Sequence, residues 1–248
     1  MKKNFSILFV LILLFTTNTA WSQSAKKKGG GSKALKGGLL SLGIGISFGS
    51  IEQAGLNESI KLSKANSAAT TDEFKSATEY LAYVTYRLAT APLAVQFRPS
   101  IYTQSTHGTG LGGNYDYDLN GYTVFPIVRF IALSNDIIDF YLQGGLGYAN
   151  IEGSITNAFT RVGFKGSAFG TQLGIGADFC FFPEHCVGVE GSYRYLPIDR
   201  NIVTSSSGGL PNGVTNATPN RELENSSFDD IATSLSGVSG IVSYSFNF

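Results

Sequence analysis

The chain has 248 residues with 18 basic and 18 acidic side chains, so its net charge is zero and it lacks the basic surface expected of a nucleic-acid-binding protein. Charged residues make up 15% of the sequence, well below the roughly 25% of soluble domains. It is rich in glycine (30) and in aromatic residues, with 12 tyrosines and 18 phenylalanines. The length favours a single domain.

The first 22 residues have the pattern of a secretory signal peptide. Met1-Lys2-Lys3 is positively charged, residues 7–15 are apolar, and residues 16–23 are small or polar apart from Trp21. The apolar run is too short to span a membrane as a helix. We predict cleavage after Ala20 or after Ser22, and no lipoprotein anchor because no cysteine follows the apolar run.

Residues 23–38 contain five lysines and many glycines but no apolar pattern. This composition predicts a flexible, solvated tether. Contact with anionic lipid headgroups is the alternative, and it is disfavoured because no amphipathic stripe accompanies the charge.

From residue 40 onward, eight segments alternate between apolar and polar residues. Period-two alternation predicts β-strands with one apolar and one polar face. The predicted strands are 40–48, 79–88, 93–102, 117–131, 138–148, 169–179, 187–195 and 238–248. The last one is the clearest, since Val242, Tyr244 and Phe246 alternate with serines and an asparagine. Segment 117–131 is apolar on both faces, so its register stays open.

The connections between these strands also alternate in length. Three are short, near residues 90–92, 134–136 and 182–184, and four are long and polar, over residues 52–77, 104–116, 150–166 and 197–233. This alternation is typical of barrels that span an outer membrane. The predicted fold class is therefore all-β: residues 39–248 form an eight-stranded antiparallel transmembrane β-barrel with short periplasmic turns and long extracellular loops.

Charged residues fall on the strand faces opposite to the apolar series. An eight-stranded barrel has an interior that side chains can just fill. Isolated charges there would be costly, so we expect them to pair in a network that plugs the lumen. The predicted members are Glu79, Arg87, Arg98, Asp178, Glu190 and Arg194, and also Arg129 if strand 117–131 directs it inward.

The two cysteines, Cys180 and Cys186, lie close together in an exported chain. An oxidising destination favours a disulfide between them. We expect no metal site, because a structural zinc site needs four ligands and only His185 is near.

Together with the signal peptide and the final strand, the pieces Phe125-Pro-Ile-Val-Arg129 and Tyr141-Leu-Gln-Gly-Gly-Leu-Gly-Tyr148 give the chain a family resemblance. It resembles the small eight-stranded outer-membrane β-barrels, and more narrowly the single-domain barrels of Bacteroidetes-type bacteria. The resemblance implies a place in the outer membrane of a Gram-negative bacterium, among its lipids and lipopolysaccharide. It also implies that the barrel assembly machinery reads the last strand, through Tyr244, Phe246 and Phe248.

Two features depart from that family. Pro126 lies within a predicted strand and requires a bulge or a gap in the ladder. No peptidoglycan-binding domain follows the barrel in this sequence.

The sequence offers little for catalysis. His107, in Ser105-Thr106-His107, could serve as a base acting on lipid, but its neighbours offer no obvious orienting carboxylate. We therefore expect no catalytic residues and no cofactor, and a structural or surface-binding role through the long loops, above all 197–233. The alternatives are an outer-membrane enzyme acting on lipid A or on surface substrates, and a narrow pore. A soluble barrel holding an apolar ligand is disfavoured, because the inward faces carry the charges.

Overall fold

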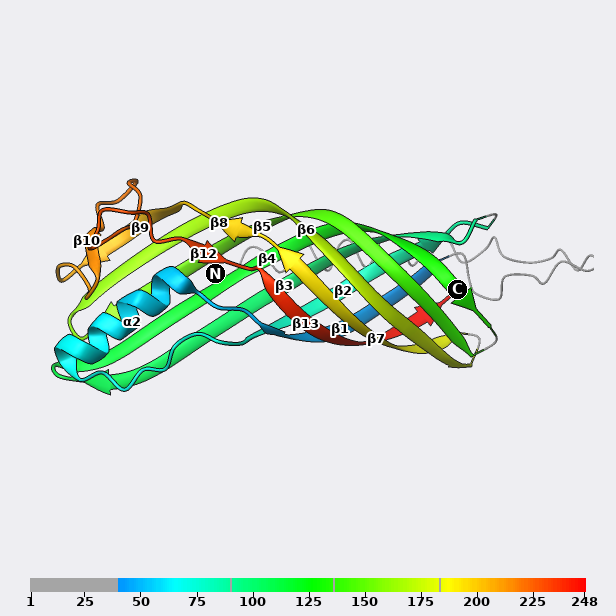
Figure 1. Cartoon of the computed structure of the whole chain (residues 1–248), viewed down its shortest axis with the longest axis horizontal. Helices are drawn as coiled ribbons and strands as arrows, with labels where there is room; N and C mark the ends of the chain where they lie inside the picture. Colours follow the sequence, from blue (N-terminus) through cyan, green and yellow to red (C-terminus); the bar gives the residue numbers. More distant parts are fainter. Residues whose placement is uncertain (1–39, 90, 136, 183) are drawn as a thin grey trace, which may run out of the picture. The chain divides into compact units, whose positions relative to one another are not determined.

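The computed structural model describes residues 40–248 except residues 90, 136 and 183, so the predicted signal peptide (1–22) and tether (23–38) lie outside the described residues. Eight long antiparallel strands close into a barrel (Figure 1), in which each strand pairs with its neighbour along the chain and the last pairs with the first. The strands are β1 (Leu40–Ser50), β2 (Ala77–Arg87), β3 (Leu93–Gly110), β4 (Gly113–Ser134), β5 (Ile138–Asn157), β6 (Thr160–Phe182), β7 (His185–Tyr195) and β13 (Gly237–Asn247). The predicted eight-stranded antiparallel barrel is confirmed.

The half of the barrel near the short turns carries a band of apolar side chains on its outer surface. Ile44, Leu173 and Val242 are 65%, 63% and 52% exposed, which would be costly in water and is expected where the barrel faces lipid. We call this half the band region. No helix in the described part of the chain is long and apolar enough to cross a membrane.

The register left open for residues 117–131 is now defined. In this part of β4 the side chains of odd-numbered residues point inward, among them Phe125 and Arg129, which are 1% and 5% exposed. Pro126 points outward and produces a gap: β4 pairs with β5 at Val124 and again at Ile127, with no shift of register. A proline has no N–H to donate, so the ladder is interrupted locally without a bulge.

The predicted loop boundaries at 104–116 and 150–166 are wrong. β3 and β4 pair continuously to a tight turn at Gly110–Gly113, and β5 and β6 pair to a turn at Asn157–Thr160. Period-two alternation continues through both segments with polar residues facing outward, so strands extend where polarity suggested loops.

The other two long connections fold onto these extended strands. Residues 52–77 contain α2 (Ala54–Ser67), which the sequence analysis missed. The segment after β7 contains β8 (Pro197–Ile198), β9 (Asn201–Ser207), β10 (Val214–Asn216), β11 (Glu224–Asn225) and β12 (Thr233–Ser234). β9 pairs with β6 and β12 pairs with β8, and α2 lies at the same end as β8–β12 (Figure 1).

These parts enclose a second interior, which is apolar. We call it the loop module: the extended halves of β3–β6 together with residues 51–76 and 196–236. Its core is completely buried, as in a soluble domain. Core side chains include Leu56, Ile60, Tyr117, Leu119, Ile151, Ile155, Phe164, Leu196, Val203 and Leu223.

Candidate functional site

The interior of the band region holds all seven charged residues predicted to line the lumen. At its centre, Glu190 of β7 accepts two hydrogen bonds from the Arg98 guanidinium of β3, at 2.8 and 2.7 Å. Arg129 of β4 lies between two carboxylates, 3.3 Å from Asp178 Oδ2 and 3.5 Å from Glu190 Oε2. The Arg98–Glu190 pair joins strands on opposite sides of the barrel, and the Arg129 pairs join β4 to β6 and β7, so together they fill its cross-section.

Neutral side chains complete the centre of this network. Gln143 donates to Glu190 at 2.7 Å and accepts a hydrogen bond from Arg129 Nε at 3.0 Å. The Arg129 guanidinium lies 4.0 Å from the centre of the Tyr141 ring, a cation–π contact. Buried charges are tolerated when their remaining hydrogen-bonding groups are satisfied in this way.

Arg194 links the network to the loop module. Its Nη1 donates to both carboxylate oxygens of Glu79, at 2.9 and 3.1 Å, and its Nε donates to the main-chain oxygen of Leu235 at 2.7 Å. Ser100 and Thr123 donate further hydrogen bonds to Glu79. Arg194 thus binds both the lumen carboxylate of Glu79 and the main chain of Leu235, in the segment that leads into β13.

At the short-turn end, Arg87 pairs with a residue that the sequence analysis did not include. We expected Arg87 to meet Glu79, Asp178 or Glu190, but it donates to Asp139 Oδ2 of β5 at 2.9 Å. The alternation of β5 shows that Asp139 faces inward. It does not show that Asp139 lies at the same level of the barrel as Arg87, because that depends on the registers between the strands. Within the described residues the buried atoms Arg87 Nε, Asp139 Oδ1 and Asp178 Oδ1 have no hydrogen-bond partner, and Asp139 and Asp178 are directly opposite each other on β5 and β6, so this end is the least completely paired.

The charges of the network balance. Among the described residues of the band region, four arginines (Arg87, Arg98, Arg129 and Arg194) form ion pairs with four carboxylates (Glu79, Asp139, Asp178 and Glu190). The cavities beside Glu79 and Arg194 measure about 10 Å³ each, room for about one water molecule. This packing is suited to closing the lumen rather than to passing solutes.

Above the network, Gln53 holds the loop module closed. Its side chain exchanges hydrogen bonds with the main chain of Ser234 (2.6 and 2.8 Å) and donates to Gln104 Oε1 at 3.1 Å. Gln104 in turn donates to the carbonyl oxygens of Ile51 and Ser76, at 3.1 and 2.9 Å. These buried amides tie both long connections to β3, and an isolated glutamine gave no signal of this in the sequence.

His107 lies on the outer surface of the loop module. Its Nδ1 is 3.2 Å from Asp116 Oδ1 on the neighbouring strand, so the structure supplies the orienting carboxylate that we did not find in the sequence. In the described part of the chain, no hydrogen bond joins Ser105 to His107. The same part contains no group of three or more metal-binding side chains.

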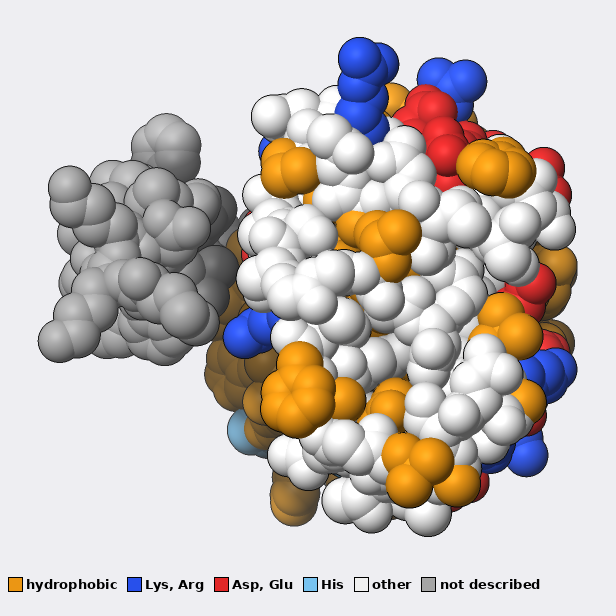
Figure 2. All heavy atoms as spheres, turned by 90° about the vertical axis from the view of Figure 1, so that its left-hand side faces the viewer, with side chains coloured by type: hydrophobic (Ala, Val, Ile, Leu, Met, Phe, Trp, Pro, Cys, Tyr) orange, Lys and Arg blue, Asp and Glu red, His pale blue; other side chains and the backbone are white. Residues whose placement is uncertain are grey.

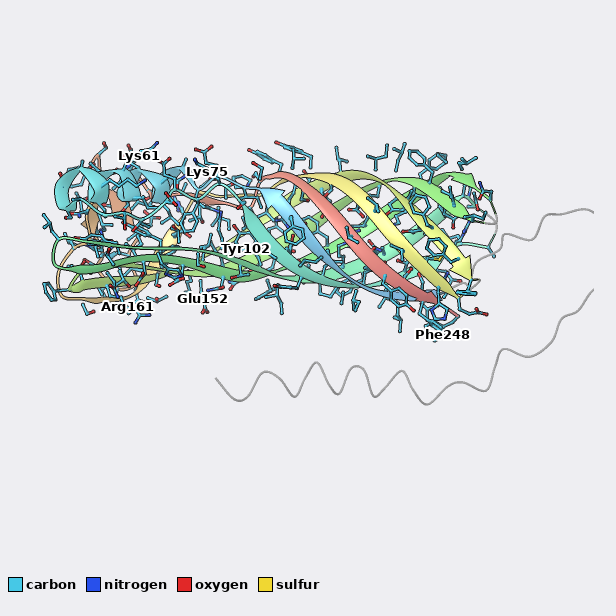
Figure 3. The ribbon with its side chains drawn as sticks, turned by 90° about the horizontal axis from the view of Figure 1, so that it is seen from below. Lys61, Lys75, Tyr102, Glu152, Arg161 and Phe248 are labelled. Atoms are coloured by element: carbon cyan, nitrogen blue, oxygen red, sulfur yellow. A yellow bond between two sulfur atoms is a disulfide. The ribbon has the colours of Figure 1, made fainter. Side chains whose placement is uncertain are left out.

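The remaining predicted residues lie at the short-turn end. Cys180 and Cys186 are directly opposite each other on β6 and β7 and form the predicted disulfide, with Cα atoms 4.0 Å apart. Phe246 packs edge-on against Phe248 and against His185. Figure 3 shows Phe248 at the end opposite to Lys61 and Arg161. A role of Tyr244, Phe246 and Phe248 in barrel assembly stays a prediction.

Comparison with solved structures agrees with this architecture. The chain is similar to the outer membrane protein OprG from Pseudomonas aeruginosa, with 12% identity over 86% of this chain and 97% of that chain and a TM-score of 0.52. Ail of Yersinia pestis (13% identity, 86% and 99% coverage, TM-score 0.41) and the N-terminal barrel domain of OprF from P. aeruginosa (14%, 86% and 99%, 0.39) are also similar.

No protein-family model and no curated protein sequence matches the chain. At these identities the likeness to OprG shows the fold, which is that of the small outer-membrane β-barrels. The narrower resemblance to Bacteroidetes-type barrels stays a prediction.

Proposed function

We propose that this chain is an outer-membrane protein of a Gram-negative bacterium, which closes its own lumen and presents the loop module at the cell surface. Its role is structural or ligand-binding. The observation that carries the proposal is the charge-balanced network, in which each lumen arginine has a carboxylate partner. The apolar band supports membrane residence, because its exposed side chains need a lipid environment.

A closed lumen disfavours the pore. A conducting path needs continuous water along the barrel, whereas Arg98, Arg129 and Glu190 form direct contacts across its centre. Opening would have to break several of these contacts at once, and a buried charge that loses its partner is strongly destabilising.

The loop module supports binding at the surface. Residues that bind partners are often carried on connections held by a rigid scaffold. Here the connections are packed on the extended strands through a buried core, so their outer surfaces keep a fixed shape. The pair His107–Asp116 is the feature closest to an enzyme site, but it has no nucleophile bonded to it in the described residues. We therefore propose a non-enzymatic role, without cofactor or metal.

Two measurements test the proposal. In planar lipid bilayers the purified barrel should give no conductance steps, and stable unitary currents would contradict a closed lumen. A peptide tag inserted beside Leu210 should be accessible to antibody on intact cells. A matched tag in the short turn after Ser134 should become accessible only after the outer membrane is permeabilised, and the reverse pattern would overturn the orientation.

A further inference from the structure

Four turns meet at the end of the loop module farthest from the band region. We call this surface the tip: residues 64–70, 109–115, 156–161 and 206–213. Leu111 N donates to Ser67 O, and Ala158 N donates to Asn114 O, both at 2.8 Å. The Asn212 side chain donates to Ser67 Oγ at 3.2 Å. The first two bonds join turn 109–115 to turns 64–70 and 156–161, and the third joins turn 206–213 to turn 64–70, so all four turns form one surface.

A glycine permits the fourth turn to lie against the third. Gly208 has φ +74°, a left-handed conformation that favours glycine, and a Cβ there would lie 2.0 Å from the Phe159 carbonyl oxygen. The two turns therefore approach closely only because residue 208 has no side chain.

Each of three turns of the tip presents one large apolar side chain to solvent. Phe159 is 83% exposed, Leu111 is 71% exposed and Leu210 is 50% exposed. Most other large apolar residues of the loop module are buried in its core; Phe228, outside the tip, is also exposed. Exposed apolar side chains gathered at one place commonly mark an interaction surface.

The tip has positive charges and no negative ones. Its four turns contain Lys64 and Arg161 but no aspartate or glutamate. Asp116, just below the tip on β4, is paired with His107. Figure 2 shows this end of the molecule, where hydrophobic side chains are separated by uncharged surface and both acidic and basic side chains lie towards the edge.

The tip is too far from the band region to touch the membrane that holds the barrel. On β4 the outward apolar series ends at Tyr122, and the outward residues beyond it are Asn120, Asp118, Asp116 and Asn114. Eight residues of strand, 113–120, therefore extend beyond the band, which corresponds to about 25 Å along the strand and about 20 Å along the barrel axis at a usual strand tilt. The tip faces away from the barrel's own bilayer.

We propose that the tip binds the surface of a facing anionic phospholipid bilayer. Leu111, Phe159 and Leu210 enter the headgroup region, and Lys64 and Arg161 contact lipid phosphates. Aromatic and leucine side chains with nearby basic residues are the combination that binds anionic membrane interfaces. The absence of carboxylates from the four turns selects this partner over a cationic surface. The inference rests on the proposed surface exposure of the loop module and names the partner that it would bind.

Binding can be measured without cells, so failure of the inference is distinct from failure of the proposed function. The full barrel is embedded in nanodiscs of neutral phosphatidylcholine and mixed with sucrose-loaded vesicles. One vesicle set contains phosphatidylcholine alone, and the other also contains phosphatidylserine. Co-sedimentation with the second set is expected, and it should weaken as salt is raised, because surface charge is screened.

Variants identify the surface responsible. Phe159→Ser should weaken binding by more than about tenfold, because the variant loses the free energy gained when the phenyl ring moves from water into the headgroup region. Lys64→Gln and Arg161→Gln should each weaken binding by about fivefold, the equivalent of about 1 kcal/mol per basic residue. Phe228→Ser is the matched control: Phe228 is 75% exposed in the same module but is followed by Asp229 and Asp230, and its loss should change nothing.

Heat-dependent gel mobility verifies that each variant is folded. Three results would overturn the inference: no co-sedimentation with phosphatidylserine vesicles, binding that Phe159→Ser leaves intact, or nanodiscs that associate with one another when no vesicles are present. The last result would show that a second copy of the chain, rather than a lipid surface, covers the tip.

Discussion

The band region and the loop module use the same four strands in opposite ways. In the band region, β4 directs Arg129 into the barrel and Val128 and Phe130 out of it. In the loop module the same strand directs Tyr117 and Leu119 inward, both 0% exposed, while Asp116 and Asp118 lie on the opposite face. The comparison shows that the surroundings, rather than the strand, decide which face is polar: lipid outside requires apolar side chains, and water outside permits charges.

The interiors should respond differently when a side chain is removed. Glu190→Ala leaves Arg98 and Arg129 facing each other without their shared carboxylate, and it should cost about 3–5 kcal/mol of barrel stability. Urea unfolding of the barrel in lipid vesicles measures the loss. The double variant Arg98→Met with Glu190→Ala should recover part of it, because one unpaired charge is removed. An unchanged unfolding midpoint for Glu190→Ala would contradict a stabilising ion pair between Glu190 and the arginines of the lumen.

Removing an apolar side chain from the loop module should act locally. Leu119→Ala should destabilise the module by about 2–5 kcal/mol, because it leaves a cavity in a close-packed core. Limited proteolysis should then cut the connections 51–76 and 196–236 while the band region stays resistant. Asn120→Ala, the exposed neighbour on the same strand, serves as the control and should behave like the wild type. Simultaneous loss of both regions would show that they form one cooperative unit.

A charge placed on the outer surface distinguishes the two regions directly. Val242→Arg lies in the apolar band and should cost about 2–4 kcal/mol if it is near the middle of the bilayer. Asp118→Arg lies on the outer face of the loop module, and it should change stability by less than about 0.5 kcal/mol. Folding yields into vesicles and unfolding midpoints provide both values. Equal effects would mean that the border between lipid and water is misplaced.

The smallest expected effect concerns the junction between the regions. Gln53→Ala removes the side-chain partner of the Ser234 main chain and one of the hydrogen bonds accepted by Gln104 Oε1, at a cost of about 1–3 kcal/mol. Faster proteolysis of 51–76 and 196–236 should report the loosened junction. Thr70→Ala removes two exposed hydrogen bonds between the Thr70 hydroxyl and the main chain of Thr109, and it provides the control. If both variants resist proteolysis equally, the buried amides do not hold the module closed.

The strands of the band region could be predicted from the sequence because their apolar residues face lipid and their charged residues face the lumen throughout. Apolar residues on one parity and charges on the other predicted the outward face of β1 and the inward positions of Arg98 and Glu190. Register between distant strands is not contained in that pattern. For this reason the partnership of Arg87 with Asp139 was missed.

The loop module was missed because polarity was taken as a sign of loops. Its alternation is present in the sequence: Tyr115, Tyr117 and Leu119 alternate with Asp116 and Asp118. Similar alternation occurs at 151–156 and 161–165. These segments could have been assigned to strands by allowing the apolar residues to move from the outward face of a strand to its inward face along the chain. The helix α2 has a weaker signal, because serines and an asparagine share its buried face with two apolar residues.

Hydrogen exchange of the barrel in lipid tests the central claim most directly, namely that a closed barrel carries a folded module rather than loose loops. Amides of 113–120, 151–156 and 54–67 should exchange slowly, because they belong to paired strands and a packed helix. The amides of the turn residues Gly112 and Phe159, which donate no backbone hydrogen bond within the described residues, provide the fast reference in the same sample. Exchange of 113–120 and 151–156 as fast as at Gly112 and Phe159 would contradict the account.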